Sequence, residues 1–213
     1  MTCLIKCVCK NGTCQAKPLT KLYVNNSICS DLLWAINHLS RLPGMHVLRS
    51  LDWDINDADL TAYCDASLAG LGFWFPDLSV GFWSHLPDDP PKDTIFYFEA
   101  LSVLSAIKHS TSFGTSVTKL VIYTDNLNTV QMFNSLSALP AYNNILKDSV
   151  DHLLSDIENP IELRVIHIAG ELNIVADALS CGFFHTVVDS APDIVINNFS
   201  PPRIRRELGE VKK

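Results

Sequence analysis

Apolar residues recur at every third or fourth position between residues 26 and 42, as at Ile28, Leu32 and Ile36. This spacing predicts an amphipathic helix, which the Leu42-Pro43-Gly44 segment would end. The 20 residues at the start of the chain are polar and show no regular spacing. We therefore expect a Cys-rich leader over 1–20 and a helical connector over 21–57.

The pattern changes beyond residue 58, where short apolar runs alternate with longer segments of helical spacing. The apolar runs predict five strands, at residues 60–65, 70–76, 78–84, 119–124 and 161–168. Helical spacing predicts four helices, at residues 94–109, 126–136, 142–157 and 171–180. This order predicts an α/β fold with one mixed five-stranded sheet, in which a three-strand antiparallel meander precedes βα units and helices cover the faces.

Beyond Gly182 the chain loses this pattern. A Ser200-Pro201-Pro202 segment leads into a stretch with several arginines and lysines, among them Arg205 and Lys212. We therefore expect the folded domain to span 58–183 and residues 184–213 to form a basic linker tail.

Composition fits one medium-sized domain with flanking segments, because 47% of the 213 residues are hydrophobic. No apolar run approaches the roughly 18 residues of a membrane span. The N-terminus lacks the pattern of a secretory signal, because Lys6, Lys10 and Asn11 interrupt it. We expect an intracellular protein, in the cytoplasm or nucleus, with no membrane partner.

Four of the seven cysteines cluster at the start of the chain. They are Cys3, Cys7, Cys9 and Cys14. Their spacing matches none of the paired-cysteine patterns of zinc sites, so an irregular leader with reduced thiols is favoured over a metal site there. Cys64 alternates with apolar residues and is expected to be a small core residue.

Acidic residues dominate the predicted domain. The net charge of the chain is −7, and residues 55–185 hold 16 acidic and 5 basic side chains, which gives this segment a net charge of −11. Such a domain repels a phosphate backbone unless bound cations offset its charge. We expect weak intrinsic affinity for nucleic acid, with binding that depends on metals, the flanks or a neighbouring domain.

Four carboxylates stand out by their setting. Asp65 and Asp125 lie in or just after apolar strand-type runs, whereas Glu99 and Asp177 lie in helix-type runs. A carboxylate near apolar surface is costly unless it is paired or binds a metal. If the four converged, they would form an all-oxygen site suited to Mg²⁺ or Mn²⁺. Turn capping and positions at the edge of the core are the simpler alternatives.

Four motifs around these acids share an order along the chain. They are Asp65-Ala66-Ser67 with Gly70 and Gly72, then Glu99, then Thr124-Asp125-Asn126, and last His167-Ile168-Ala169-Gly170-Glu171-Leu172-Asn173-Ile174-Val175-Ala176-Asp177-Ala178-Leu179-Ser180. Together they cover about residues 58–182, and they resemble the ribonuclease H domain of retrotransposon reverse transcriptases. Within this family, the motifs are similar to those of long-terminal-repeat elements and of tyrosine-recombinase (DIRS-like) elements.

The resemblance implies a metal-dependent endoribonuclease that cleaves the RNA strand of RNA–DNA hybrids. It implies that Asp65, Glu99, Asp125 and Asp177 hold Mg²⁺, with Mn²⁺ as an alternative, in a two-metal-ion site. It also implies that His167 assists turnover near the leaving group; a hydrogen-bonded histidine at a strand end is the alternative.

The same resemblance implies neighbours for this chain. A reverse transcriptase polymerase region would be its partner, besides the RNA–DNA hybrid. Residues 21–50 would be a remnant of the thumb or connection, and no polymerase activity is expected from this chain.

Two departures from the family pattern keep other functions open. Cys181 stands where the family usually has a basic residue, and residues 143–157 are acidic on balance, so a basic substrate-binding helix is missing. A catalytically silent retroelement fragment that acts as a nucleic-acid-binding or structural module is the alternative. A third alternative is another nuclease or transposase of the ribonuclease H-like superfamily. The motif from His167 to Ser180 argues against that alternative.

Other residues of these motifs are expected to serve the fold. Asn126 and Asn173 are typical of turns and helix caps, and Gly70 and Gly72 of close backbone approach. The aromatic residues Trp74, Phe82 and Trp83 are expected in the core.

Overall fold

The computed structural model describes residues 7–10, 13–16, 26–40, 53–87, 94–113, 116–139, 142–156 and 158–204. The chain divides into two compact units, one made of residues 1–42 with 207–213 and the other of residues 43–206. Among the described residues, no helix is both long and apolar enough to cross a membrane.

The smaller unit contains a hairpin and a helix. Strands β1 (Cys7–Lys10) and β2 (Thr13–Ala16) pair antiparallel, so the expectation of an irregular leader is wrong here. Helix α1 (Asn26–Leu39) confirms the predicted helix and ends three residues earlier than expected. The cysteine side chains of the leader lie outside the described residues, so the expectation that they bind no metal stays a prediction.

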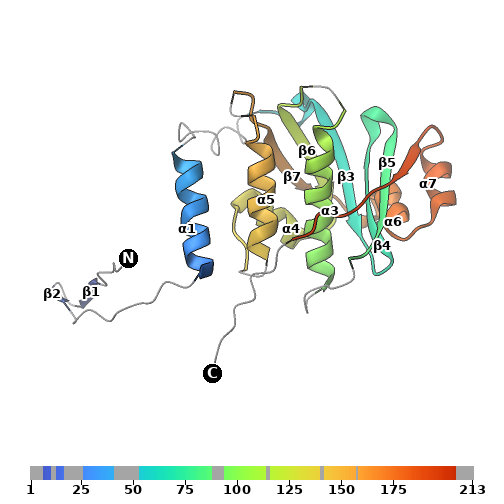
Figure 1. Ribbon diagram of the computed structural model, residues 1–213. Coiled ribbons are helices and arrows are strands. Elements are labelled where there is room, and N and C mark those ends of the chain that lie inside the picture. Colours follow the sequence, from blue (N-terminus) through green and yellow to red (C-terminus); the bar gives the residue numbers. More distant parts are fainter. Residues whose placement is uncertain are drawn as a thin grey trace. The chain divides into compact units, whose positions relative to one another are not determined.

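A six-stranded mixed sheet forms the centre of the larger unit, in the order β7-β6-β3-β4-β5-β8 (Figure 1). The strands are β3 (Leu60–Ala66), β4 (Gly70–Phe75), β5 (Val80–His85), β6 (Lys119–Thr124), β7 (Glu162–His167) and β8 (Val195–Asn198). The first three form the antiparallel meander, and β6 and β7 follow in parallel beside β3. The predicted mixed α/β fold is confirmed, with one strand more than expected.

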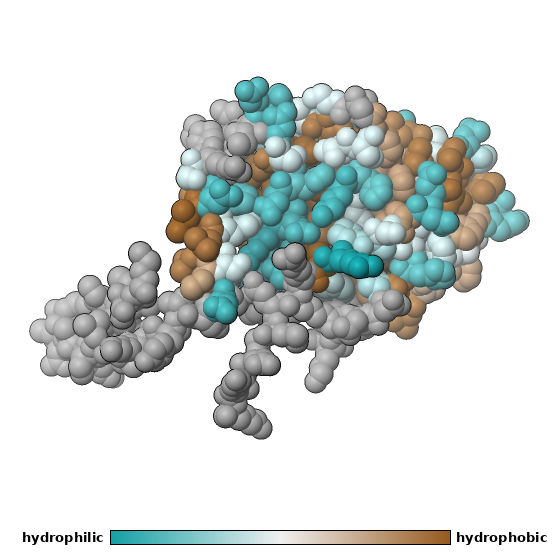
Figure 2. Space-filling model, in the orientation of Figure 1, coloured by the Kyte–Doolittle hydropathy of each residue, from teal (hydrophilic) through white to brown (hydrophobic). Residues whose placement is uncertain are grey.

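Five α-helices lie in the described part of this unit. They are α3 (Thr94–Ser110), α4 (Leu127–Ser135), α5 (Asn143–Leu153), α6 (Ile174–Ser180) and α7 (Phe184–Ser190). Helix α3 packs on β3 and β4 and also contacts α5, and α6 packs on β3 and β4 as well. In the orientation of Figure 2, hydrophilic residues gather over α5, as expected for a helix with one buried side. Helix α3, by contrast, is buried throughout Tyr97–Ile107.

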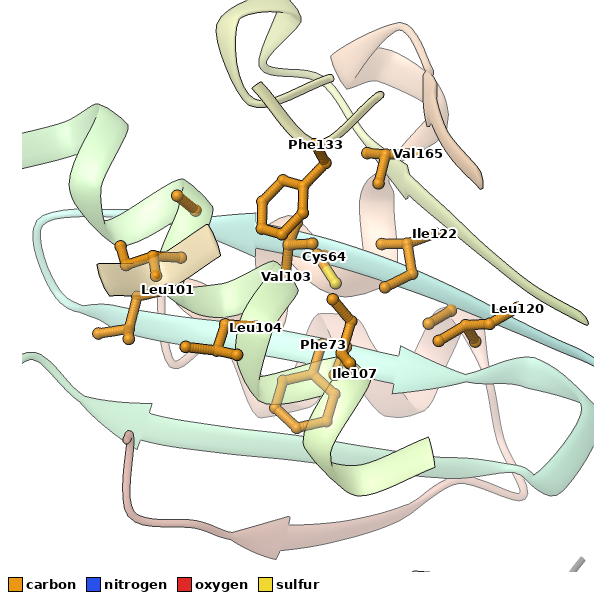
Figure 3. Packing of buried hydrophobic residues seen from close by; sticks show 14 of the residues in the cluster. Cys64, Phe73, Leu101, Val103, Leu104, Ile107, Leu120, Ile122, Phe133 and Val165 are labelled. Carbon is orange, nitrogen blue, oxygen red and sulfur yellow. The ribbon is translucent and has the colours of Figure 1, made fainter. Parts of the chain in front are cut away.

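Two apolar clusters show that α3 and α6 cover opposite faces of the sheet. Phe73 of β4 belongs to the large cluster beneath α3, which also contains Cys64, Leu104 and Ile107 (Figure 3). The next residue, Trp74, packs instead with Val175, Ala178, Leu179 and Val187, which belong to α6 and α7. Successive side chains of a strand point to opposite faces. The predicted core positions of Cys64 and Phe82 are confirmed.

The segment expected to be a linker tail, 184–213, contains α7 and β8. Strand β8 pairs parallel with β5, and the chain after it continues over the core: the Phe199 ring lies 4.9 Å from the Phe73 ring. A four-residue strand that holds two asparagines gives almost no pattern in the sequence. It forms here because the edge of β5 and the aromatic rings beside it offer it partners.

A side chain added at Gly72 is expected to destabilise the fold strongly. A Cβ atom at this position would lie 2.5 Å from the Ser180 amide nitrogen and 2.7 Å from the Ala176 carbonyl oxygen. Because both neighbours are backbone, helix α6 would have to move. We expect Gly72→Ala to lower the free energy of unfolding by about 3 kcal/mol, as measured by urea denaturation.

The matched control for this prediction is Gly81→Ala, on the neighbouring strand. Its Cβ would meet the flexible end of the Ile194 side chain at 2.9 Å, so we expect a clearly smaller loss. Equal losses for the two variants would show that α6 is not packed as tightly on the sheet as the structure has it.

Candidate active site

Asp65 and Asp125 lie at the same end of two neighbouring parallel strands. Tyr63 of β3 pairs with Tyr123 of β6 in the parallel register, so the residues two positions further on are level with each other. Asp65 is the next-to-last residue of β3, and Asp125 directly follows β6. The parallel pairing of β3 with β6 therefore brings the two aspartates to the same end of the sheet.

Glu99 joins this pair from helix α3, which covers the same end of β3. One oxygen atom of each carboxylate, from Asp65, Glu99 and Asp125, lies within 4.8 Å of the other two. Asp65 is 5% exposed and Glu99 is 4% exposed, whereas Asp125 is more open to solvent. Three of the four predicted metal ligands are thus brought together.

Burial makes the charged form of two of these carboxylates costly. It raises the pKa of Glu99 to about 9, and the nearby charges of Asp65 and Asp125 add to the rise. Burial likewise raises the pKa of Asp65 to about 6, against which a hydrogen bond from Ser180 acts. Such clustered acids in a fold without a bound cation repel one another.

One buried oxygen of this cluster lacks a partner. Oε2 of Glu99 has no hydrogen bond to any residue that the structure describes. A buried, unpartnered carboxylate oxygen is costly, and a cation at the cluster would relieve that cost. The donor set is made of carboxylate oxygens alone, which fits hard cations such as Mg²⁺ and Mn²⁺.

Asp177 stands at the rim of this cluster. It lies on α6 with an exposed side chain, and its charge contributes to the raised pKa of Asp65. It does not belong to the group of three whose ligand atoms lie within 4.8 Å. Its carboxylate instead accepts a long contact of 3.9 Å from the Cys181 thiol. The structure therefore places Asp177 beside the other acids but not among them.

His167 ends strand β7 on the same side of the sheet. It pairs with Thr124, the residue that precedes Asp125, and its side chain is exposed. Gly170, three residues on, lies so close to Asp125 that an added Cβ would be 3.1 Å from the Oδ2 atom of Asp125. The segment after β7 thus borders the acidic cluster.

The remaining motif residues have structural partners. Asn126 caps α4, because its side chain accepts a hydrogen bond from the Thr129 amide at 3.0 Å, as predicted. Asn173 occupies the N-cap position of α6 but does not cap it; its side chain donates to the Cys64 carbonyl oxygen at 3.0 Å. Gly70 and Gly72 allow close backbone approach, which confirms that prediction.

Sequence reasoning missed the role of Ser180. Its hydroxyl donates to Oδ2 of Asp65 at 2.5 Å. The serine was visible as the last residue of the closing motif, but a contact between residues 115 positions apart has no signal in spacing. Only the packing of α6 on β3 and β4 reveals it.

Comparison with known proteins gives distant structural matches only. No family model matches the chain, and no curated protein matches it. A crystal structure of LC11-RNase H1 in complex with an RNA/DNA hybrid is similar at 16% identity and a TM-score of 0.48, over 57% of this chain and 93% of that chain.

Two further structures are similar at about the same level. RNase H1 from the halophilic archaeon Halobacterium salinarum NRC-1 has 14% identity and a TM-score of 0.42, over 62% of this chain and 98% of its own. The N-terminal RNase H domain of a Mycobacterium tuberculosis protein has 11% identity and a TM-score of 0.44, over 62% and 99%. Similarity as low as this carries no argument about activity, which therefore depends on the chemistry of the site.

Proposed function

We propose that this chain is a metal-dependent endoribonuclease that cleaves the RNA strand of RNA–DNA hybrids. The observation that carries the proposal is the convergence of Asp65, Glu99 and Asp125 within 4.8 Å, two of them buried. Nothing in the folding of a sheet requires three mutually repelling carboxylates at one end of it. A site for divalent cations explains why they are there.

In this proposal the cations are held by Asp65, Glu99 and Asp125, and Asp177 adds a fourth carboxylate at the exposed edge of the site. Bound divalent cations would supply Lewis-acid stabilisation of the phosphodiester and lower the pKa of the attacking water. The buried carboxylates fix the position of the site, because Asp65 and Glu99 come from a strand and a helix within the core. Asp125 and Asp177 lie nearer to solvent, where a nucleic acid strand would approach.

We further propose that the chain derives from a retroelement reverse transcriptase, whose polymerase region would be its partner. The motif from His167 to Ser180 supports this, together with the net charge of −11 over residues 55–185. Helix α5 carries Asp148 and Asp151 beside Lys147, so this helix offers no excess of positive charge to hold a hybrid. A neighbouring domain would supply that attraction.

Comparison of matched duplexes tests the substrate class. An RNA–DNA hybrid, a DNA duplex and an RNA duplex of one sequence would be incubated with the full chain and Mg²⁺, each labelled in turn on either strand. We expect cleavage of the RNA strand of the hybrid alone, because 2′-hydroxyls and hybrid shape distinguish it. Cleavage of the DNA duplex would instead indicate another nuclease of the superfamily.

A catalytically silent fragment that acts as a nucleic-acid-binding or structural module is the second candidate, and the acidic balance of α5 together with Cys181 favours it over an enzyme. Titration of a hybrid in Ca²⁺ separates the two functions, because Ca²⁺ permits binding without turnover. Tight binding without cleavage in Mg²⁺ would support the module, whereas weak binding with cleavage would support the enzyme.

His167 gives a prediction specific to turnover. If it assists proton transfer near the leaving group, His167→Ala should lower kcat about 100-fold and leave Mn²⁺ affinity unchanged. His185→Ala is the matched control, because His185 is also exposed and pairs with Asp189 on α7. Equal kcat for wild-type protein and His167→Ala would leave His167 with a merely structural role at the end of β7.

A further inference from the structure

Ser180 is a buried hydroxyl that contacts the candidate site directly. It is the last residue of α6 and is 0% exposed. Its Oγ lies 2.5 Å from Oδ2 of Asp65 and 2.9 Å from the Asp177 carbonyl oxygen. A hydroxyl has only one proton to donate, and a bond to an ionised carboxylate is stronger than one to a carbonyl. The shorter contact is therefore the bond that matters for Asp65.

Two glycines bring the serine to this place. Gly72 is the antiparallel partner of Asp65, and its missing Cβ leaves the room that the Ser180 amide occupies. A Cβ on Gly70 would likewise lie 3.1 Å from the Ser180 carbonyl oxygen. The last turn of α6 thus lies directly on the hairpin formed by β3 and β4, which sets the height of the hydroxyl above Asp65.

Further hydrogen bonds hold this turn of α6 in place. The Ser67 hydroxyl donates to the Ser180 carbonyl oxygen at 2.9 Å and accepts bonds from the Ala69 and Gly70 amides. At the other end of α6, Asn173 donates to the carbonyl oxygen of Cys64, the residue before Asp65. Residues seven positions apart share one side of a helix. The same side of α6 therefore holds β3 at Cys64 and at Asp65.

We propose that Ser180 is a positioning residue, which fixes the orientation of the Asp65 carboxylate so that it can hold a divalent cation together with Glu99 and Asp125. The inference rests on the proposed function. The terminal torsion of an aspartate has a broad energy minimum, so the carboxylate needs an external bond to hold it at one angle. Partners that orient metal ligands in this way typically change metal affinity 10- to 100-fold when they are removed.

Mn²⁺ binding to the metal-free full chain, measured by calorimetry, tests this role without any need for cleavage. We expect Ser180→Ala to raise the Kd for Mn²⁺ by about 10- to 100-fold. Ser102→Ala is the matched control: Ser102 is equally buried and donates to the Gly72 carbonyl oxygen at 3.0 Å, but it contacts none of the four acids through that bond. Its Kd for Mn²⁺ should equal that of the wild-type protein.

The outcomes separate this inference from the proposed function. Wild-type binding with an unchanged Kd in folded Ser180→Ala would overturn the positioning role and leave the proposed function standing. No Mn²⁺ binding by wild-type protein would overturn both. If Ser180→Ala does not fold, Ser180→Cys keeps the volume while its thiol is a weak donor. The same weakening is then expected for Ser180→Cys, and an unchanged Kd would overturn the inference.

Discussion

Asp125→Asn is expected to reduce the rate of hybrid cleavage about 1000-fold. The carboxylate of Asp125 lies within 4.8 Å of the ligand atoms of Asp65 and Glu99, and it is the member of the three that is most open to a substrate. An amide has the same shape but no charge, so it would hold a divalent cation poorly. Metal ions stabilise the transition state by several kcal/mol, and each 1.4 kcal/mol of activation free energy changes the rate about tenfold.

Single-turnover cleavage of a labelled hybrid in Mg²⁺ measures this effect. Asp193→Asn is the control, since Asp193 is an exposed acid in the turn between α7 and β8. Thermal unfolding would show that both variants keep the fold. Cleavage by Asp125→Asn at the wild-type rate would remove Asp125 from the site and contradict the proposed assignment.

Glu99→Gln is expected to make the metal-free protein more stable at neutral pH. The pKa of Glu99 rises from its ordinary value of 4.5 to about 9 on folding. A group whose pKa is raised in the fold costs nothing below its ordinary pKa and destabilises the fold as the pH rises toward the folded pKa. At about 1.4 kcal/mol per pH unit, Glu99 alone should therefore cost the metal-free wild-type protein about 4 kcal/mol of stability between pH 5 and pH 8. Glutamine does not titrate and removes the contribution of Glu99 to this loss.

Urea denaturation in a chelator at several pH values measures the difference. Asp65, whose pKa rises to about 6, lowers the stability of both proteins in the lower part of this pH range. A shallower loss of stability with pH should therefore remain in Glu99→Gln. Saturating Mg²⁺ or Mn²⁺ should then stabilise the wild-type protein by about 3 kcal/mol at 100 times Kd, and the variant by less. Identical pH profiles for the two proteins would show that Glu99 is not held in a costly buried state.

Much of this fold follows from the sequence because its strands are short apolar runs with clear ends. The runs at 60–65 and 119–124 predicted β3 and β6 to within one residue. Helix α3 was equally clear, since the predicted range 94–109 differs from Thr94–Ser110 by one residue. The positions of Asp65, Glu99 and Asp125 in or just after these elements could be foreseen, but their convergence needed the parallel pairing of β3 with β6.

Other features depend on tertiary contacts that leave no local pattern. Strand β8 is only four residues long and is held by the edge of β5, so the sequence predicted a linker there. The Ser180–Asp65 bond joins residues far apart in the chain. The exposed place of Asp177 follows from the orientation of the short helix α6, which helical spacing cannot give.

The dependence of RNA cleavage on added metal tests the central claim most directly. Metal-free protein would be mixed with an RNA–DNA hybrid labelled on the RNA strand, and Mg²⁺ or Mn²⁺ would then be added. We expect the RNA to be cut only after this addition, and a chelator to stop the reaction. Cleavage that continues in excess chelator, or no cleavage by folded wild-type protein in either metal, would contradict it.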